Sequence, residues 1–281
     1  MTASWMPPLG AAAVLMMIYA VLVLYGYRDQ ILLDQGIVVL SAAASLLGSM
    51  IGLGGGLIVV PILVLTGLTP QVAVAGGLAT TLANSTASSV VYAQQKRIMY
   101  RTAITLGMTA IPGAVLGSIL VKDAEPGIFT ILLASALFLA SFYIFVSRKM
   151  KSGKAKKRYR KAVFIPASFF AGVVSAFFGI GGGLVFVPIL LMVLGIGMMH
   201  AAPASTFAIL MTSIVGLASH SILGHVDIIL TLLLSAGALI GGAAGARLSL
   251  IVGEKYLRIL AAVTTGGAAT RLMLDTIMPQ E

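Results

Sequence analysis

The sequence predicts an all-α polytopic membrane protein made of two inverted repeats. Only 9% of the 281 residues are charged and 59% are hydrophobic, whereas soluble proteins carry about 25% charged residues. Several apolar stretches exceed the ~20 residues that cross a bilayer as a helix, and one motif occurs twice in the chain. A transmembrane β-barrel is excluded because its strands are short and alternate apolar with polar residues.

The duplicated motif lies at residues 52–63 and 179–190. Its copies read G-L-G-G-G-L-I-V-V-P-I-L and G-I-G-G-G-L-V-F-V-P-I-L, with nine of twelve positions identical. The first copy interrupts an apolar block at 36–68, which as one helix would measure ~50 Å against a bilayer core of ~30 Å. Each glycine inside a helix costs ~1 kcal/mol relative to alanine. We therefore expect two half-helices that meet at the triple glycine, in both copies.

Each broken block is followed by three apolar spans. We expect them at 71–92, 102–120 and 127–147 in the first half, and at 200–223, 228–250 and 255–274 in the second. An extra helix is expected at 8–27, before the repeats. The predicted divisions are an N-terminal segment 1–35, a first repeat 36–147, a basic cytoplasmic loop 148–161, a second repeat 162–275 and a tail 276–281.

The net charge of +10 comes mainly from one segment. Residues 148–161 hold nine of the 18 basic residues, so the remaining ones nearly balance the eight acidic ones. Such a segment is typical of a cytoplasmic loop that sets membrane topology, and contact with anionic lipid headgroups is the second interpretation. Nucleic-acid binding is disfavoured.

Loop charges indicate that the second repeat is inverted. The loop after the first unbroken span carries Lys96, Arg97 and Arg101, whereas its counterpart at 224–227 has no Lys or Arg. With positive charge kept inside, equivalent loops lie on opposite sides, which requires an odd number of crossings per repeat. Each broken block is then a re-entrant hairpin. Seven full spans and two hairpins follow, with the N-terminus cytoplasmic and the C-terminus outside.

The glycine breaks are the predicted substrate site. Inverted repeats with discontinuous helices at the bilayer midplane are a recurring plan of secondary transporters. The half-helices that begin at Leu57 and Leu184 have free amide N–H groups, and such helix ends attract anions. Tight helix packing is the alternative role for the glycines. The predicted substrate-binding glycines are Gly54, Gly55, Gly56, Gly181, Gly182 and Gly183. Pro61 and Pro188 are predicted to fix a bend in the half-helices.

Polar side chains in the spans would complete the site. Asn84 and Ser85 in one half, and Thr212 and Ser213 in the other, are the candidates, because each supplies a hydrogen-bond donor. Further hydroxyls in the same spans are Thr80, Thr81, Ser88, Ser205 and Thr206. The alternative is that a Ser or Thr hydroxyl bonds back to its own helix.

Coupling and catalytic groups are sparse in the sequence. Every acidic residue falls at an expected span end, loop or tail. His220 lies within an expected span, whereas His200 and His225 fall near span ends or loops. There is no cysteine, no metal-ligand cluster, no catalytic triad and no phosphate loop, so we expect neither an enzyme nor a cofactor. Dipoles and hydroxyls would then meet the substrate charge, which favours an anion of modest charge over a metal cation.

The doubled pattern G-x-G-G-G-x-x-x-V-P-x-L resembles the TauE/SafE family of sulfite exporters. The resemblance covers about residues 36–275 and includes Gly113/Gly117, Gly241/Gly245 and the turn His225-Val226-Asp227. We assign those glycine pairs to helix packing. The resemblance implies an integral permease of the bacterial-type inner membrane that moves sulfite, thiosulfate, sulfonates or other small organic anions.

The sequence thus predicts a secondary transporter of small anions, with sulfur oxyanions or organosulfonates first, that works by alternating access. Its expected partners are the small anion and the lipid bilayer. A permease for lactate-like carboxylates is one alternative. A membrane assembly or receptor component without transport is another, and a membrane-embedded enzyme is the least favoured.

Overall fold

The computed structural model describes residues 30–146, 157–252, 266–267 and 269–270, and all regular structure in these ranges is helical. The expected helix at 8–27, the segment 148–156 and most of the expected span at 255–274 lie outside the described residues. The elements are α2 Gln30–Ile51, α3 Gly56–Leu65, α4 Pro70–Gln94, α5 Tyr100–Leu120, α6 Pro126–Val146, α7 Lys157–Phe178, α8 Gly183–Pro188, η2 Ile189–Val193, α9 Met198–Ile222 and α10 Ile228–Leu248. The predicted all-helical class is confirmed.

The first glycine motif separates α2 from α3. The backbone turns there through Gly52 and Gly54, whose φ angles of 76° and 84° are open to glycine at little cost. The two arms are unequal. α2 has 22 residues and is about 33 Å long, whereas α3 has 10 residues and is about 15 Å long.

The second glycine motif separates α7 from α8 in the same way. Gly179, Gly181 and Gly182 all have positive φ angles, between 72° and 78°. α8 is a single short α-helix of six residues that continues directly into the π-helix η2. α7 already begins at Lys157, so the last residues of the expected basic loop 148–161 are helical.

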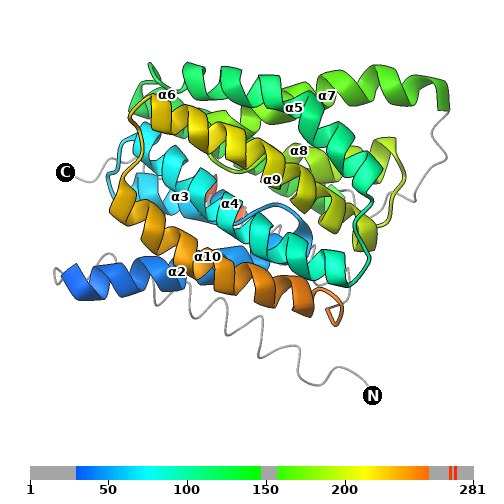
Figure 1. Cartoon of the computed structure of the whole chain (residues 1–281). Coiled ribbons are helices and arrows are strands. Elements are labelled where there is room, and N and C mark those ends of the chain that lie inside the picture. Colours follow the sequence, from blue (N-terminus) through cyan, green and yellow to red (C-terminus); the bar gives the residue numbers. More distant parts are fainter. Residues whose placement is uncertain (1–29, 147–156, 253–265, 268, 271–281) are drawn as a thin grey trace.

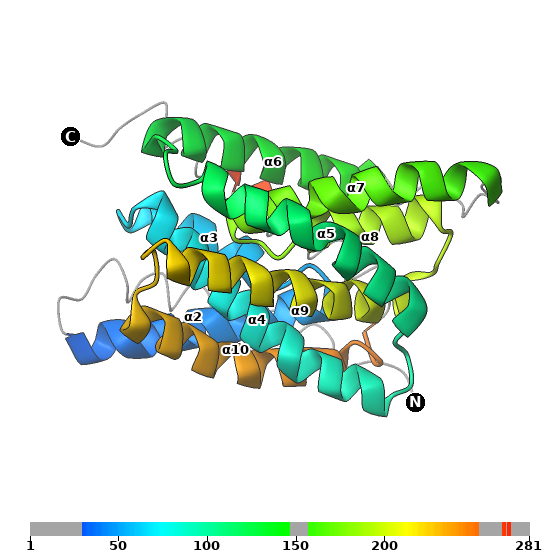
Figure 2. The same ribbon diagram turned by 45° about the horizontal axis from the view of Figure 1, so that its top comes forward.

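The arms of the two broken blocks open toward opposite ends of the molecule. In Figures 1 and 2, α2 starts and α3 ends at the same side, and α7 starts and η2 ends at the other side. α4, α5, α9 and α10 run the length between those sides. This arrangement is what two inverted re-entrant hairpins require, and the inverted repeat itself stays a prediction.

Four helices of the described part are long and apolar enough to cross a membrane. They are Asp34–Ile51, Tyr100–Leu120, Met198–Ile222 and Ile228–Leu248. α4 has 25 residues and equals α9 in length. Its Ser, Thr and Asn side chains make it less hydrophobic, and because α4 lies between other helices most of them are buried. A helix that faces protein rather than lipid has no need of a wholly apolar surface.

Side-chain contacts group the loops into two ends. At one end Arg97, just after α4, donates to the carbonyl of Met199 at the start of α9 (3.1 Å) and to Ser249 after α10 (2.9 Å). At the other end Gln71, at the start of α4, donates to the carbonyl of Lys122 in the turn between α5 and α6 (3.0 Å). These two ends are called the Arg97 end and the Lys122 end below.

Glycine stripes bring two helix pairs into close contact. The carbonyl of Phe169 in α7 occupies the place where Gly113 of α5 would carry a side chain, and Ala42 of α2 does the same at Gly241 of α10. Gly117 and Gly245 face α7 and α2 in the same manner. The packing role predicted for these four glycines is confirmed, and it follows the rule that small residues allow membrane helices to approach closely.

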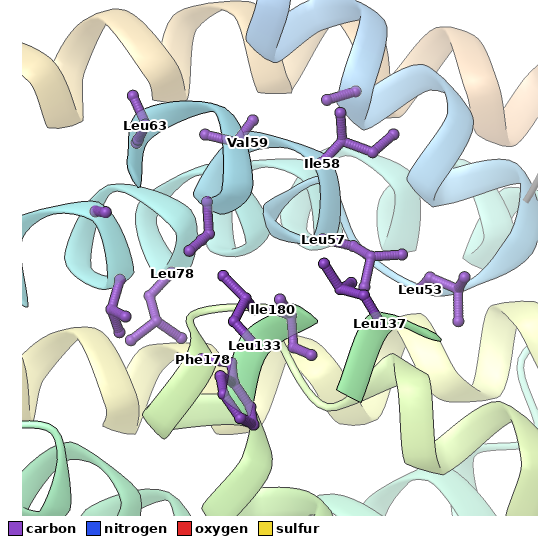
Figure 3. Packing of buried hydrophobic residues seen from close by; sticks show 14 of the residues in the cluster. Leu53, Leu57, Ile58, Val59, Leu63, Leu78, Leu133, Leu137, Phe178 and Ile180 are labelled. Carbon is purple, nitrogen blue, oxygen red and sulfur yellow. The ribbon is translucent and has the colours of Figure 1, made fainter. Parts of the chain in front are cut away.

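The apolar core surrounds the two breaks. Leu57 of α3, Ile180 of the second break, and Leu133 and Leu137 of α6 belong to one buried cluster, and Figure 3 shows these side chains gathered together. The rings of Phe177 and Phe178, at the end of α7, pack on Phe129 of α6 at centroid distances of 5.7 and 5.9 Å. This packing holds both breaks deep inside the protein.

Candidate functional site

The two glycine breaks touch each other. The carbonyl oxygen of Gly179 occupies the position that a Cβ of Gly56 would take, and the carbonyl oxygen of Gly52 occupies that position at Gly183. Gly52 and Gly179 are equivalent positions of the duplicated motif, and so are Gly56 and Gly183. The contact is therefore reciprocal, and only glycine fits at positions 56 and 183. We call this contact region the glycine crossing.

α4 and α9 pass along the glycine crossing in equivalent ways. The backbone of Ala202 in α9 packs against Gly52, and the backbone of Val74 in α4 packs against Gly179. A shift of 128 residues takes Val74 to Ala202. Thr81 of α4 and Ile209 of α9, which the same shift relates, contact the breaks further along these helices.

Two hydroxyl groups fix the backbone of the first break. The N–H of Gly56 donates to Thr81 Oγ1 of α4 at 3.1 Å, and Ser205 Oγ of α9 donates to the carbonyl of Gly52 at 2.7 Å. Thr81 also packs with its methyl group against both breaks. Thr81 and Ser205 therefore hold the glycine crossing more directly than the four polar residues predicted for the site.

Some amide N–H groups of the crossing remain free. Within the described part of the chain, the N–H groups of Gly55, Leu57, Gly183 and Leu184 form no hydrogen bond. All residues of 54–56 and 181–183 are buried. Because a buried N–H group without a partner costs about 1–3 kcal/mol, these amides are candidates for ligand contacts.

Each break also has an unpaired serine beside it. Ser45 of α2 lies with its Oγ against Gly55, and Ser175 of α7 lies against Gly182. Both serines are 0% exposed, and among the described residues neither hydroxyl has a hydrogen-bond partner. The sequence reasoning missed them. Their signal in the sequence is weak, because each is one of several serines before its motif: Ser41, Ser45 and Ser49 in α2, and Ser168 and Ser175 in α7.

The structure divides the four predicted polar residues into two kinds. Ser85 bonds back to the carbonyl of Leu82 at 3.1 Å, and Thr212 bonds back to Ile209 at 3.0 Å, which is the alternative role considered for such residues. Asn84 and Ser213 are buried, and their side-chain polar atoms have no partner within the described residues.

Asn84 lies beside α10 rather than directly on a break. Its side-chain oxygen and backbone fill the space next to Gly242 of α10. Thr80, one helical turn earlier on α4, packs against Gly55. Asn84 therefore stands one turn away from the glycine crossing. Its buried amide lacks partners at both ends, which is uncommon in native proteins and calls for an explanation such as a ligand.

The two prolines occupy different surroundings. Pro61 lies inside α3, which continues to Leu65, whereas Pro188 ends α8 and is followed by the π-helix η2. A proline removes one helical hydrogen bond and clashes with the preceding turn. In the second half the wider π-helix follows that disturbance. The predicted bend at these prolines stays a prediction.

The side chains described at the glycine crossing are uncharged. Among the residues that the structure describes, no three His, Asp or Glu side chains come together in a way that could hold a metal ion. The polar groups at the crossing are backbone amides and hydroxyls, and the carboxamide of Asn84 lies one helical turn away. Such groups bind anions and neutral polar molecules through hydrogen bonds.

Comparison with known proteins agrees with this reading of the chain. The family model for sulfite exporter TauE/SafE matches residues 37–272. The probable membrane transporter protein YunE of Bacillus subtilis is 29% identical over 238 residues, which cover 76% of this chain and 87% of that protein. A probable membrane transporter protein of Methanocaldococcus jannaschii is 28% identical over 241 residues, covering 80% and 89%. No solved structure is significantly similar.

The family and both relatives are named as membrane transporters, in the relatives' case as probable ones, and not as enzymes, as the sequence predicts. The match covers both glycine motifs and all of the described helices from α3 to α10. The chain is an integral membrane protein that belongs to the sulfite exporter TauE/SafE family of transporters.

Proposed function

We propose that this chain is a secondary transporter of small anions, with sulfite, thiosulfate or organosulfonates as the first substrate class. The observation that carries the proposal is the glycine crossing. Free backbone amides at Gly55 and Gly183 and the unpaired hydroxyls of Ser45 and Ser175 lie there, buried and without partners among the described residues. An oxyanion supplies several acceptor oxygens that such donors bind.

The neutral character of the crossing supports an anion of modest charge. The side chains described above as lining it are Ser45, Thr80, Thr81, Ser175 and Ser205, and none carries a charge. A metal cation in such a low-dielectric site would need fixed negative charges beside it. Dipoles and hydroxyls suffice for a sulfonate or a sulfur oxyanion when its charge is spread over several oxygens.

The closed crossing supports alternating access. Residues 54–56 and 181–183 are all buried, so an anion reaches them only when one of the two breaks moves. Because the arms of the first break open to one side and those of the second to the other (Figures 1 and 2), movement of each break would expose the site to a different side of the membrane.

Transport by the purified full-length protein in liposomes tests this function. Uptake of radiolabelled sulfite, thiosulfate and lactate is compared with that of empty liposomes. Saturable uptake of sulfite or thiosulfate supports the proposal. Uptake of lactate alone would establish the carboxylate permease instead. A protein that carries none of these three compounds and no methanesulfonate would overturn the proposal.

Serine variants test the site. Ser45→Ala and Ser175→Ala each remove one unpaired buried hydroxyl, so we expect the KM for the transported anion to rise about tenfold, since a hydrogen bond to a charged group contributes about 1.5–3 kcal/mol. Ser168→Ala is the matched control, because Ser168 is equally buried in α7 but bonds back to the carbonyl of Phe164 at 2.7 Å. An unchanged KM in both test variants would contradict the site.

A further inference from the structure

A buried arginine joins four helices at the Arg97 end. Tyr92, at the end of α4, donates its hydroxyl to the carbonyl of Ser49 in α2 at 2.7 Å. The guanidinium of Arg97 lies 5.2 Å from the centre of the Tyr92 ring and also binds Met199 and Ser249, next to α9 and α10. These contacts hold the helices together at that end, and they depend on the permanent positive charge of Arg97.

Two histidines occupy the corresponding place at the other end. His220, in the last turn of α9, is 0% exposed. Its Nε2 lies 3.2 Å from the carbonyl oxygen of Ala176 in α7, and its Nδ1 lies 3.1 Å from Nδ1 of His225. The two rings are 5.2 Å apart, centre to centre. His225 is half-buried in the turn before α10.

The two pairs are equivalent in the internal duplication. A shift of 128 residues relates their members, Tyr92 with His220 and Arg97 with His225. The backbone acceptors correspond as well, since Ser49 and Ala176 each stand three residues before the first glycine of their motif. The second half therefore keeps the architecture of the first but replaces a permanent charge with a pair of titratable rings.

The acceptor in α7 fixes which nitrogen of His220 carries the proton. A carbonyl oxygen only accepts hydrogen bonds, so Nε2 of His220 must donate to Ala176, as the hydroxyl of Tyr92 donates to Ser49. In the neutral ring Nδ1 of His220 is then an acceptor. The Nδ1 of His225 must donate to it, which leaves Nε2 of His225 free to take a proton.

We propose that His220 and His225 form a proton-binding pair that couples anion transport to proton movement, an inference that rests on the transport function proposed above. A proton from the aqueous side binds Nε2 of His225 and makes an imidazolium. The Nδ1 proton of His225 then passes to Nδ1 of His220. His225 is left neutral with its proton on Nε2, and His220 becomes the imidazolium.

The surroundings of His225 disfavour its charged form. Burial and the positive charge of Lys122 lower the pKa of His225 below the ordinary histidine value. Among the described residues, the charged side chains at this end are Asp34 of α2, Lys122, Asp123 and Glu125 of the α5–α6 turn and Asp227 before α10. Asp227 accepts a hydrogen bond from the N–H of Leu230 at 2.9 Å. No ion pair joins either histidine to a carboxylate in the described part of the chain.

The position of Ala176 connects the pair with the glycine crossing. Ala176 is the chain neighbour of Ser175, whose side chain lies against Gly182 of the second break. His220 is hydrogen-bonded to α7, the helix that leads into the second break. A proton on His220 therefore places a positive charge next to that helix. Such a charge would compensate part of the charge of an anion at the crossing, which has no charged side chain of its own.

The experiment uses full-length protein in liposomes with the membrane voltage held at zero by potassium and valinomycin. Thiosulfate and methanesulfonate stay fully ionised throughout, so any dependence on pH belongs to the protein. With one proton coupled per anion, a gradient of one pH unit should drive about a tenfold concentration difference of the anion, since both correspond to about 1.4 kcal/mol. Trapped pyranine reports the accompanying proton movement.

His220→Tyr is the decisive variant. A tyrosine at this position can donate to Ala176 as Tyr92 donates to Ser49, yet it takes up no proton near neutral pH. We expect downhill anion flux without a pH-driven concentration difference and without pyranine response. The double variant His220→Tyr with His225→Arg reproduces the pair of Tyr92 and Arg97. It is tested as well, in case the single variant fails to fold. His200→Gln is the matched control and should behave as the wild type.

The outcomes separate the two proposals. A tenfold difference that persists in His220→Tyr overturns the proton-binding pair, and so does a wild-type protein that moves the anion only downhill. Absence of any flux of sulfite, thiosulfate and methanesulfonate in the wild-type protein would instead overturn the transport function. Loss of coupling in His220→Tyr with retained coupling in His200→Gln supports the inference.

Discussion

Lys96 and Gly224 hold the same left-handed backbone at opposite ends of the molecule, with φ angles of 53° and 75°. Lys96 is the only residue other than glycine with a positive φ in the described part of the chain. At these positions the chain turns from α4 toward α5 and from α9 toward α10. The left-handed region costs a non-glycine residue about 1–2 kcal/mol. The same turn conformation is therefore less favourable at Lys96 than at Gly224.

Gly224→Ala should therefore lower the free energy of unfolding by about 1 kcal/mol. A Cβ at Gly224 meets nothing within 4 Å, so the whole cost comes from the backbone conformation. Thermal unfolding in detergent measures it. Gly197→Ala is the control, because a Cβ there also meets nothing and its φ is −64°. An equal effect in both variants would contradict the backbone explanation.

At the scale of single residues, the sequence identified the breaks but not everything beside them. The triple glycines were predicted to end a helix, and positive φ angles at Gly54 and Gly181 show why glycine is needed there. The hydroxyls of Ser45 and Ser175 were missed, because their importance depends on which helix face meets the break. That face follows from tertiary packing, which one sequence does not contain.

The helix pairs α2–α10 and α5–α7 show how glycine sets the distance between elements. Each pair brings carbonyl groups of one helix to the place of the missing side chains on the other, at Gly241 and at Gly113. In a membrane such pairs are held by close van der Waals contact, since lipid is as apolar as the helices themselves. A larger side chain therefore forces the two backbones apart.

Gly241→Val should destabilise the protein by about 3 kcal/mol or more, because backbone atoms of Ala42 already occupy the site of a Cβ and overpacking of this kind strains the backbone. The melting temperature in detergent should fall accordingly. Gly127→Val provides the comparison, since a Cβ at Gly127 meets nothing within 4 Å. A wild-type melting temperature for Gly241→Val would disprove close packing of α2 on α10.

At the scale of elements, the sequence predicted the described unbroken spans to within two residues, whereas α2 begins six residues before the expected block at 36–68. The 36–68 block was expected to consist of two half-helices, and α2 proves long enough to cross a membrane while α3 does not. Apolar composition marks where a chain lies in lipid, but it does not show how far each arm reaches. The π-helix η2 after Pro188 was also not foreseen, because hydropathy carries no information on helix type.

Over the whole molecule, the two ends differ in the chemistry that closes them. The Arg97 end is held by a permanent charge, and the Lys122 end contains the pair of His220 and His225. Positive charge in the loop at Arg97 predicts that this end faces the cytoplasm, which would place His225 outside. The proposed orientation has the N-terminus cytoplasmic, the C-terminus outside and the segment 148–161 near anionic lipid headgroups.

Accessibility tags inserted near residues 30 and 225 test that orientation, and both are expected to report the outside. Tags near residues 97 and 150 should report the cytoplasm and serve as the internal comparison. If the tags at residues 30 and 225 both reported the cytoplasm, the scheme of two inverted hairpins would be wrong. The glycine crossing would then need a different path to each side of the membrane.

Stability should fall when the pH drops from 7.5 to 5.5. The pKa of His225 is lowered by burial and by Lys122, so near the ordinary histidine pKa the unfolded chain binds more protons than the folded one. Folding then becomes less favourable as the pH falls through that range. Melting temperatures in detergent should show a smaller drop for His225→Gln than for the wild type, and His200→Gln should match the wild type.

At the glycine crossing, each half of the chain buries the glycine break of the other half. Gly183 is closed off by Gly52, and Gly56 is closed off by Gly179, so a half on its own would leave its break unpaired. We expect the two halves, produced as separate chains, to be degraded singly and to reassemble when produced together. For the same reason, substitutions in one motif should be tolerated only with matching changes in the other, so that the two copies evolve as one unit.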